Sequence, residues 1–293
     1  MALLTLKRWN LAIGDGRPLV VIAGLNVLET PELALSVGRE LKDICANLGL
    51  PFIFKASFDK ANRSSITSYR GPGLEAGLKM LAEVKAELNV PICTDLHEIE
   101  QAEPVAAVAD LVQIPAFLCR QTDLVVAVAN ATLEAGGLLH IKKGQFLAPW
   151  DARAILDKIR QATNADLTIL CERGVSFGYN NLVVDMMGIP QMKDLGVPVT
   201  IDATHAVQLP GVDPRANSIA TGGRRDGVPV IARAAVAAGA DGVFLEFHPD
   251  PDKALCDGPS ALPLSAAAVL ETAEGRPRSG PRRLTDPAAR RTG

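Results

Sequence analysis

The segment from Phe54 to Ser65 carries residue types suited to hold an anionic, hydroxylated ligand. It places the cations Lys55, Lys60 and Arg63 among small hydroxyl and amide side chains, at the end of an apolar run typical of a buried strand. Lysine offers phosphate a point charge, and arginine offers phosphate or carboxylate a planar fork of donors. A solvated basic loop is the alternative for a charge run of this kind.

Polar residues also follow seven other apolar runs, each of which the sequence predicts to be a strand. The predicted strands cover residues 19–24, 52–57, 91–95, 111–115, 138–142, 167–171, 198–202 and 242–247. The residues near their ends are Asn26, Lys55, Ser57, Lys60, Asp95, Gln113, Lys142, Lys143, Gln145, Glu172, Arg173, Asp202, His205, Glu246 and His248. In a parallel barrel these side chains would converge on one mouth.

Eight strands that alternate with amphipathic helical patterns predict an α/β fold, a closed (β/α)8 or TIM barrel. An open doubly wound sheet is the alternative, although no Gly-x-Gly-x-x-Gly motif follows the first strand. Residues 3–6 and 9–13 predict a short N-terminal β-hairpin. We expect one catalytic domain over residues 1–275 and a disordered basic tail over residues 276–293, which are rich in Arg, Pro and Gly.

The cations favour a ligand with more than one anionic group. A ligand that bears both phosphate and carboxylate could be neutralised by Lys55, Lys60, Lys142 and Arg173. Arg63 with Ser64 could hold a second phosphate. Because side chains alternate along a strand, we expect one of Lys142 and Lys143 to point inward and the other to be solvated, and we choose Lys142 as the inward one. Arg173 follows an apolar run, where a buried arginine requires an anionic partner.

His205, Glu246 and Asp257 could together ligate a divalent metal, since imidazole and carboxylate suit several metals. Each has a simpler interpretation, as an exposed histidine, a strand-end glutamate and a turn aspartate. The five cysteines are scattered and form neither a zinc motif nor a disulfide framework.

The composition and charge of the chain argue against several other classes of protein. The chain has 293 residues, of which 48% are hydrophobic, and a net charge of −3. That charge argues against nucleic-acid binding. Residues 1–10 lack the apolar core of a signal peptide, and no apolar run has the length that spans a membrane. We therefore expect a soluble, cytoplasmic protein.

The motifs at these strand ends resemble those of the 3-deoxy-D-manno-octulosonate 8-phosphate synthase family. The resemblance covers residues 19–264 and depends on motifs such as Asn-Val-Leu-Glu from Asn26, Lys-Ala-Ser-Phe-Asp-Lys-Ala-Asn-Arg-Ser-Ser from Lys55, Lys-Lys-Gly-Gln-Phe from Lys142 and Asp-Ala-Thr-His from Asp202. The family condenses phosphoenolpyruvate with D-arabinose 5-phosphate and releases phosphate, in the synthesis of a lipopolysaccharide sugar. Its members are homotetramers.

The resemblance also implies roles for single residues. Those implied for phosphoenolpyruvate are Lys60, Lys142, Gln145 and Arg173. Those implied for the sugar are Lys55, Ser57, Asn62 and Asp95, with Arg63 and Ser64 on its phosphate. Gln113, Pro115 and Ala116 complete the binding set, and Phe117 and Arg120 are expected to reach the neighbouring subunit's site. The implied catalytic set is Asn26, Lys60, Asp95, His205, Glu246 and Asp257. Residues 208–225 resemble a mobile lid.

The family has metal-dependent and metal-independent classes, and the metal-dependent class carries a cysteine on the first strand. This chain has Asn26 there, and an amide oxygen is a weaker ligand than a thiolate. The resemblance therefore implies a metal-independent enzyme without a cofactor, in which His205, Glu246 and Asp257 orient water and substrate.

Other functions stay open at this stage. A heptulosonate or sialate-type synthase would use a different aldehyde, although the block from Asn62 to Ser65 favours a phosphorylated pentose. A non-catalytic barrel that senses sugar phosphates would typically have lost one of the cations, and none is missing.

Overall fold

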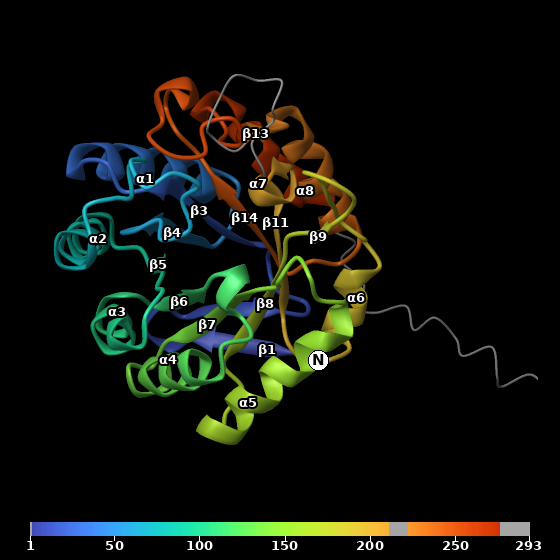
Figure 1. The fold of residues 1–293 in the computed structure, drawn as a ribbon. Coiled ribbons are helices and arrows are strands. Elements are labelled where there is room, and N and C mark those ends of the chain that lie inside the picture. Colours follow the sequence, from blue (N-terminus) through green and yellow to red (C-terminus); the bar gives the residue numbers. More distant parts are fainter. Residues whose placement is uncertain (1, 211–221, 276–293) are drawn as a thin grey trace, which may run out of the picture.

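In the computed structural model, which describes residues 2–210 and 222–275, eight parallel strands close into a barrel surrounded by helices (Figure 1). Around the barrel the order is β11-β14-β3-β4-β5-β6-β7-β8. These strands are β3 (Val20–Val27), β4 (Phe52–Ser57), β5 (Ile92–Asp95), β6 (Leu111–Ile114), β7 (Leu138–Lys142), β8 (Thr168–Glu172), β11 (Val199–Asp202) and β14 (Gly242–Glu246). The predicted TIM barrel is confirmed, and the open sheet is excluded because every strand has two neighbours.

Helices follow most of the strands. The α-helices are α1 (Pro31–Asn47), α2 (Leu74–Leu88), α3 (Ala102–Val108), α4 (Thr122–Glu134), α5 (Arg153–Thr163), α6 (Gly188–Lys193), α7 (Ala203–Ala206) and α8 (Val228–Ala237). Thr30 is the N-cap of α1, since its Oγ1 accepts a hydrogen bond from the Leu33 N–H, and a proline occupies the first helical position.

Short elements complete the described chain. The 3-10 helices are η1 (Lys7–Trp9), η2 (Ile99–Gln101), η3 (Ala116–Leu118), η4 (Pro149–Ala152), η5 (Arg225–Gly227), η6 (Pro251–Lys253) and η7 (Leu264–Gly275). Two small antiparallel pairs lie outside the barrel, and they are β9 (Val175–Ser176) with β10 (Leu182–Val183), and β12 (Gln208–Leu209) with β13 (Gly222–Gly223).

The predicted N-terminal hairpin is also confirmed. Strands β1 (Leu3–Leu6) and β2 (Leu11–Gly14) pair antiparallel. Asn10 joins them in a left-handed conformation, with φ of 47°. The buried side chains of this hairpin, Leu4, Leu6, Leu11 and Ile13, belong to the same apolar cluster as the barrel core. The hairpin therefore packs as part of the barrel domain.

A close approach of β3 and β4 shapes the mouth of the barrel. A Cβ atom at Gly24 would lie 2.0 Å from the carbonyl oxygen of Lys55, so only glycine fits there. The β3–β4 register shifts between Gly24 and Val27, which places an irregularity at Asn26. Such irregularities re-aim a side chain, and here the Asn26 amide turns toward Glu246.

Some expectations fall outside the described residues. The proposed tail over 276–293 and the central part of the proposed lid, 211–221, are among them. All five cysteines are buried and free, as expected from their scattered positions. None of the helices in the described part of the chain combines the length and apolar character that a bilayer crossing requires.

Candidate active site

The carboxyl ends of the barrel strands enclose a cavity of about 450 Å³. Most of the predicted site residues line it. They are Lys55, Lys60, Asn62, Arg63, Ser64, Asp95, Gln113, Pro115, Ala116, Phe117, Lys142, Gln145, Arg173, His205 and Asp257. These residues come from most of the length of the chain, so only barrel closure brings them together.

Four predicted residues do not line this cavity. Asn26, Ser57 and Glu246 are buried directly behind its wall, where they hydrogen-bond to residues that do line it. Arg120 is exposed, and its carbonyl oxygen accepts a hydrogen bond from Lys158. Phe117 borders the cavity but keeps 53% of its surface exposed. The expectation that Phe117 and Arg120 reach a neighbouring subunit stays a prediction.

A buried ion pair joins β4 to β14. Lys55 Nζ lies 2.7 Å from Glu246 Oε1, and the two side chains are 1% and 0% exposed. The ammonium also donates to the carbonyl oxygen of Asn26 at 3.2 Å and to Ser57 Oγ at 3.1 Å. Burial would raise the pKa of Glu246, but the charges of Lys55 and His205 lower it to about 2. The three donors of Lys55 are thus engaged within the protein, and Glu246 is an anion.

Asp95 forms a second polar group on the neighbouring strand β5. Ser57 Oγ donates to Asp95 Oδ1, and His97 Nε2 lies 3.3 Å from Asp95 Oδ2. Burial would raise the pKa of Asp95, but the hydrogen bond with His97 and the charge of Lys60 hold it well below its usual range. Asp95 therefore stays ionised and can accept hydrogen bonds from a hydroxylated ligand.

Asp202 holds the side chains of His205 and Lys142 together at the end of β11. Its carboxylate accepts a hydrogen bond from the backbone N–H of His205 at 2.8 Å, lies 2.7 Å from His205 Nδ1 and forms an ion pair with Lys142. Burial would raise the pKa of Asp202, but the charges of His205 and Lys142 lower it well below its usual range. Lys142 Nζ also lies 3.1 Å from the centroid of the Phe244 ring. The imidazole and the ammonium are thus held in fixed positions at the cavity wall.

Lys60 and Arg173 are the cations that most need an anionic ligand. Neither forms an ion pair with a residue that the structure describes, although both are buried and both line the cavity. Burial would lower the pKa of Lys60, but Glu246 and Asp95 raise it above its usual value. Arg173 donates to Gln208 Oε1 at 3.3 Å, and burial lowers its pKa. A buried arginine with only an amide partner indicates a site for an anion.

The expectation that Lys143 is solvated is wrong. Lys143 is 1% exposed, lies 3.3 Å from Glu172 Oε1 and donates to the carbonyl oxygen of Leu147 at 3.2 Å. Its position is just beyond the end of β7, where the Glu172 carboxylate and a loop carbonyl oxygen supply buried partners. The choice of Lys142 as the cavity residue is confirmed.

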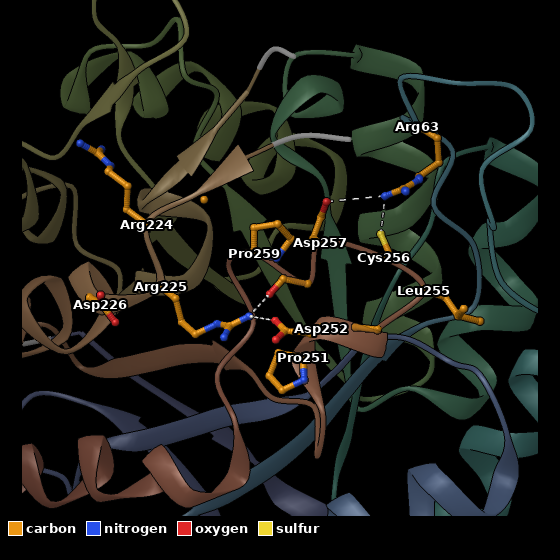
Figure 2. Close-up of a pocket in the computed structure, with 13 residues that line it drawn as sticks. Arg63, Arg224, Arg225, Asp226, Pro251, Asp252, Leu255, Cys256, Asp257 and Pro259 are labelled. Carbon is orange, nitrogen blue, oxygen red and sulfur yellow. Dashed lines mark hydrogen bonds and ion pairs between the residues drawn. The ribbon is translucent and has the colours of Figure 1, made fainter. Parts of the chain in front are cut away.

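Arg63 lines this cavity and also a second hollow of about 600 Å³, whose lining residues are drawn in Figure 2. Arg63 Nη1 lies 2.7 Å from Cys256 Sγ and 3.6 Å from Asp257 Oδ1. Its Nε atom is buried without a hydrogen-bond partner among the described residues. In the same view Arg225 donates a hydrogen bond to the carbonyl oxygen of Gly258 and forms an ion pair with the carboxylate of Asp252, so its charge is already paired. Arg63 therefore keeps one buried donor, Nε, that no described residue satisfies.

The Asn26 amide contacts the carboxylates that the sequence offers as possible metal ligands. Asn26 Nδ2 donates to Glu246 Oε2 and lies 3.4 Å from Asp257 Oδ2, while His205 Nε2 lies 3.5 Å from Glu246 Oε2. An amide N–H group thus faces the carboxylates where a metal would have to bind. Within residues 2–210 and 222–275, no group of three or more His, Cys, Asp or Glu side chains is arranged to hold a metal ion.

The sequence analysis assigned no role to several residues of the cavity wall, namely Ala61, Ser68, His97, Glu98 and Leu118. Asp202, which it named only as a strand-end residue, and Gln208 and Pro210, which fall in the predicted lid, also line the cavity. His97 follows Asp95 by two residues beyond a strand end, so its position carried the signal that selected the other site residues. Gln208 lies in β12, a strand too short to give a pattern.

A closed parallel barrel with a cation-lined mouth defines the class of the protein, a TIM-barrel enzyme that acts on small anionic substrates. The chain belongs to the DAHP synthetase I family, whose model matches residues 3–274.

Relatives within the family are close in sequence. The chain is 54% identical over 255 residues to a 2-dehydro-3-deoxyphosphooctonate aldolase of Shewanella frigidimarina, which covers 87% of each chain. It is 55% identical over 265 residues to the protein of the same name from Marinobacter nauticus, which covers 90% of this chain and 91% of the relative. Both matches therefore cover most of this chain and most of each relative.

Proposed function

We propose that this protein condenses phosphoenolpyruvate, D-arabinose 5-phosphate and water into 3-deoxy-D-manno-octulosonate 8-phosphate and inorganic phosphate. The observation that carries the proposal is the presence of two separate anion-binding groups in one cavity. Lys60, Lys142 and Arg173 form one, and Arg63 with Ser64 forms the other. The names of the relatives support the same substrates, because that product contains the carbon atoms of both.

The first group fits phosphoenolpyruvate, which bears a phosphate and a carboxylate. Arg173 offers a planar fork to one anionic group, and Lys60 and Lys142 offer point charges. Gln145 lies on the same wall. Because Arg173 and Lys60 lack carboxylate partners among the described residues, the ligand can supply the missing negative charge.

The second group fits the phosphorylated sugar. Arg63 and Ser64 bind its phosphate, and Asn62 and Asp95 bind its hydroxyl groups. These residues lie on the β4 and β5 side of the cavity, opposite Arg173. The aldehyde carbon is thereby held close to C3 of phosphoenolpyruvate.

The reaction then needs one new carbon–carbon bond and one proton for the sugar oxygen. C3 of the enol ether attacks the aldehyde carbon, water adds to C2, and the C2–O bond to phosphate breaks. The carboxylates of Asp95 and Glu246 stabilise positive charge that develops at C2. Lys60 and His205 can donate or accept protons at the cavity wall, since Asp202 fixes the His205 ring.

The same proposal makes the enzyme metal-independent. The Asn26 amide already bridges Glu246 and Asp257 and takes the place of a cation between them. His205, Glu246 and Asp257 then orient water and substrate. No cofactor is required.

Activity is expected to survive prolonged chelation. The measurement is the turnover of the protein after treatment with a chelator, with metal content checked by elemental analysis. Asn26→Cys should bind Mn²⁺ or Zn²⁺ more tightly, because it adds a thiolate to the imidazole and two carboxylates. Asn26→Ser, which adds no thiolate, is the control. Turnover that vanishes on chelation and returns with added metal would show that the present residues already form a metal site.

Arg63→Ala is expected to weaken chiefly the binding of arabinose 5-phosphate, and Arg173→Ala chiefly that of phosphoenolpyruvate. Each loses a charge-assisted contact worth about 1.5–3 kcal/mol. Titration of each substrate separately into both variants measures the two affinities. Arg160→Ala is a matched control, because Arg160 lies outside the cavity lining and its guanidinium is paired with Asp166. Equal losses for both substrates would mean that the two anion sites are wrongly assigned.

We also propose a homotetramer in the cytoplasm, where both phosphorylated substrates are soluble. Large apolar side chains are exposed on neighbouring loops beyond the barrel mouth, and they are Phe117, Phe146, Trp150, Phe177 and Met187. The loops that carry Phe146 and Phe177 are joined by a hydrogen bond from Ser176 N to the carbonyl oxygen of Gln145. Exposed apolar groups of this kind mark protein–protein contacts. Phe117 and Arg120 would then lie near the neighbouring subunit's cavity.

The simplest test of the function is the dependence on two substrates. Phosphate should be released from phosphoenolpyruvate only when an aldose phosphate is present. Phosphate release from phosphoenolpyruvate alone would point to a phosphatase instead.

A further inference from the structure

His140 lies inside the barrel and has no role in the proposed reaction. It is fully buried on β7, two residues before Lys142, so its side chain points into the interior one layer below that lysine. Its ring stacks on Phe244 with the centroids 6.0 Å apart. Nδ1 lies 3.2 Å from Gln113 Oε1, and Nε2 lies 2.9 Å from Thr200 Oγ1. Both ring nitrogens therefore have a polar partner.

The surroundings of the His140 ring favour its neutral form. Burial lowers the pKa of His140 well below its usual value, and the charge of Lys142 lowers it further. In a neutral imidazole one nitrogen donates a hydrogen bond and the other accepts one. The two partners must therefore have opposite roles.

Two arrangements satisfy both contacts. In the first, the Thr200 hydroxyl donates to Nε2, and the Nδ1–H donates to Gln113 Oε1. In the second, Nε2–H donates to Thr200, and Nδ1 accepts from the amide nitrogen of Gln113, which leaves the amide oxygen turned away. The arrangement of the ring thus decides which end of the Gln113 amide faces the cavity.

We infer that His140 is a positioning residue that holds the Gln113 amide with its nitrogen facing the cavity, as a donor to an anionic oxygen of phosphoenolpyruvate. This inference rests on the proposed function. The hydrogen bonds run in one direction, from the Thr200 hydroxyl to His140, from His140 to Gln113, and from Gln113 to the ligand.

Two observations favour this direction. Gln113 Oε1 faces the histidine, and Gln113 Nε2 has no hydrogen bond to a residue that the structure describes, while Gln113 itself lines the cavity. The single hydroxyl proton of Thr200 has two acceptors within reach, His140 Nε2 at 2.9 Å and the Leu170 carbonyl oxygen at 3.3 Å, so the Thr200 contact by itself is compatible with both arrangements. Lastly, the cavity also presents Lys142 and Arg173, and a carbonyl oxygen beside them would repel the anion they attract.

The binding test uses the full chain and phosphoenolpyruvate in isothermal titration. His140→Leu removes the donor to Gln113 and should raise the Kd for phosphoenolpyruvate about 10- to 100-fold, the loss expected for one hydrogen bond to a charged group. The Kd for arabinose 5-phosphate should stay within about twofold. His140→Asn should restore most of the affinity, because its amide nitrogen can donate from a position close to that of Nδ1.

Two further variants separate positioning from packing. Leu139→Val alters the opposite face of β7 and should leave both affinities unchanged. Thr200→Val removes the hydroxyl that sets the tautomer and should weaken phosphoenolpyruvate binding even if His140→Leu fails to fold. The inference is overturned if His140→Leu and Thr200→Val bind phosphoenolpyruvate as the unaltered protein does, or if His140→Asn is no better than His140→Leu.

Nitrogen-15 NMR of histidine-labelled protein tests the arrangement without any substrate. The His140 signals, assigned by their loss in His140→Asn, should show a protonated Nδ1 and a bare Nε2. A protonated Nε2 would overturn the inference. If the unaltered protein binds no phosphoenolpyruvate, the proposed function fails, and the tautomer still decides how His140 orients Gln113.

Discussion

Lys55→Met is expected to lower the free energy of unfolding by about 3–5 kcal/mol, because it leaves the Glu246 carboxylate buried without its principal cation. Glu246→Gln should be destabilising for the converse reason. In the double variant neither charge remains, so the combined loss should be smaller than the sum of the two single losses. Urea unfolding of the three variants measures these differences.

The control for this cycle is an exposed ion pair. Arg160 and Asp166 are paired with side chains 35% and 63% exposed, and Arg160→Met should cost less than about 1 kcal/mol. A Lys55→Met variant no less stable than Arg160→Met would contradict the account of the buried pair. The double variant should fold yet stay inactive, since Lys55 and Glu246 fix Asn26 and Ser57 behind the cavity wall.

Lys60→Met is expected to lower kcat/KM about 100- to 1000-fold, the loss typical of one charge-stabilising donor in an active site. Lys60 has no ion pair among the described residues, and the surrounding Glu246 and Asp95 keep it protonated. Its removal should therefore affect the bound substrate far more than the fold.

The measurement combines steady-state kinetics with thermal unfolding. Lys79→Met, at an exposed position of α2, is the matched control and should change neither activity nor stability. A Lys60→Met enzyme that retains normal kcat/KM would contradict the placement of Lys60 against the reacting anion. A large loss of stability with unchanged kinetics would assign Lys60 a structural role.

The barrel was predictable because parallel strands are buried on both faces and give continuous apolar runs. The bounds of β4 and β7 match the predicted ones. Helices α3, α6 and α7 have only seven, six and four residues, which are too few to show a helical repeat in the sequence.

The contacts between site residues were harder to predict from the sequence than the barrel was. Lys55 and Glu246 are 191 residues apart in the sequence. They come into contact because β4 and β14 both flank β3 in the closed barrel. Lys143 was misjudged because strand alternation does not extend past the end of β7. His97 was overlooked, although its position after Asp95 was visible. The orientation of the Asn26 amide depends on an irregularity in β3 that the sequence does not reveal.

The choice of aldehyde substrate distinguishes the proposed function from that of a heptulosonate synthase. The most direct test compares kcat/KM for D-arabinose 5-phosphate with that for D-erythrose 4-phosphate, with phosphoenolpyruvate at a fixed saturating concentration and the product identified by mass. We expect faster turnover with the five-carbon sugar, one phosphate released per phosphoenolpyruvate consumed, and an eight-carbon product. Faster turnover with erythrose 4-phosphate and a seven-carbon product would contradict the proposed function and indicate a heptulosonate synthase.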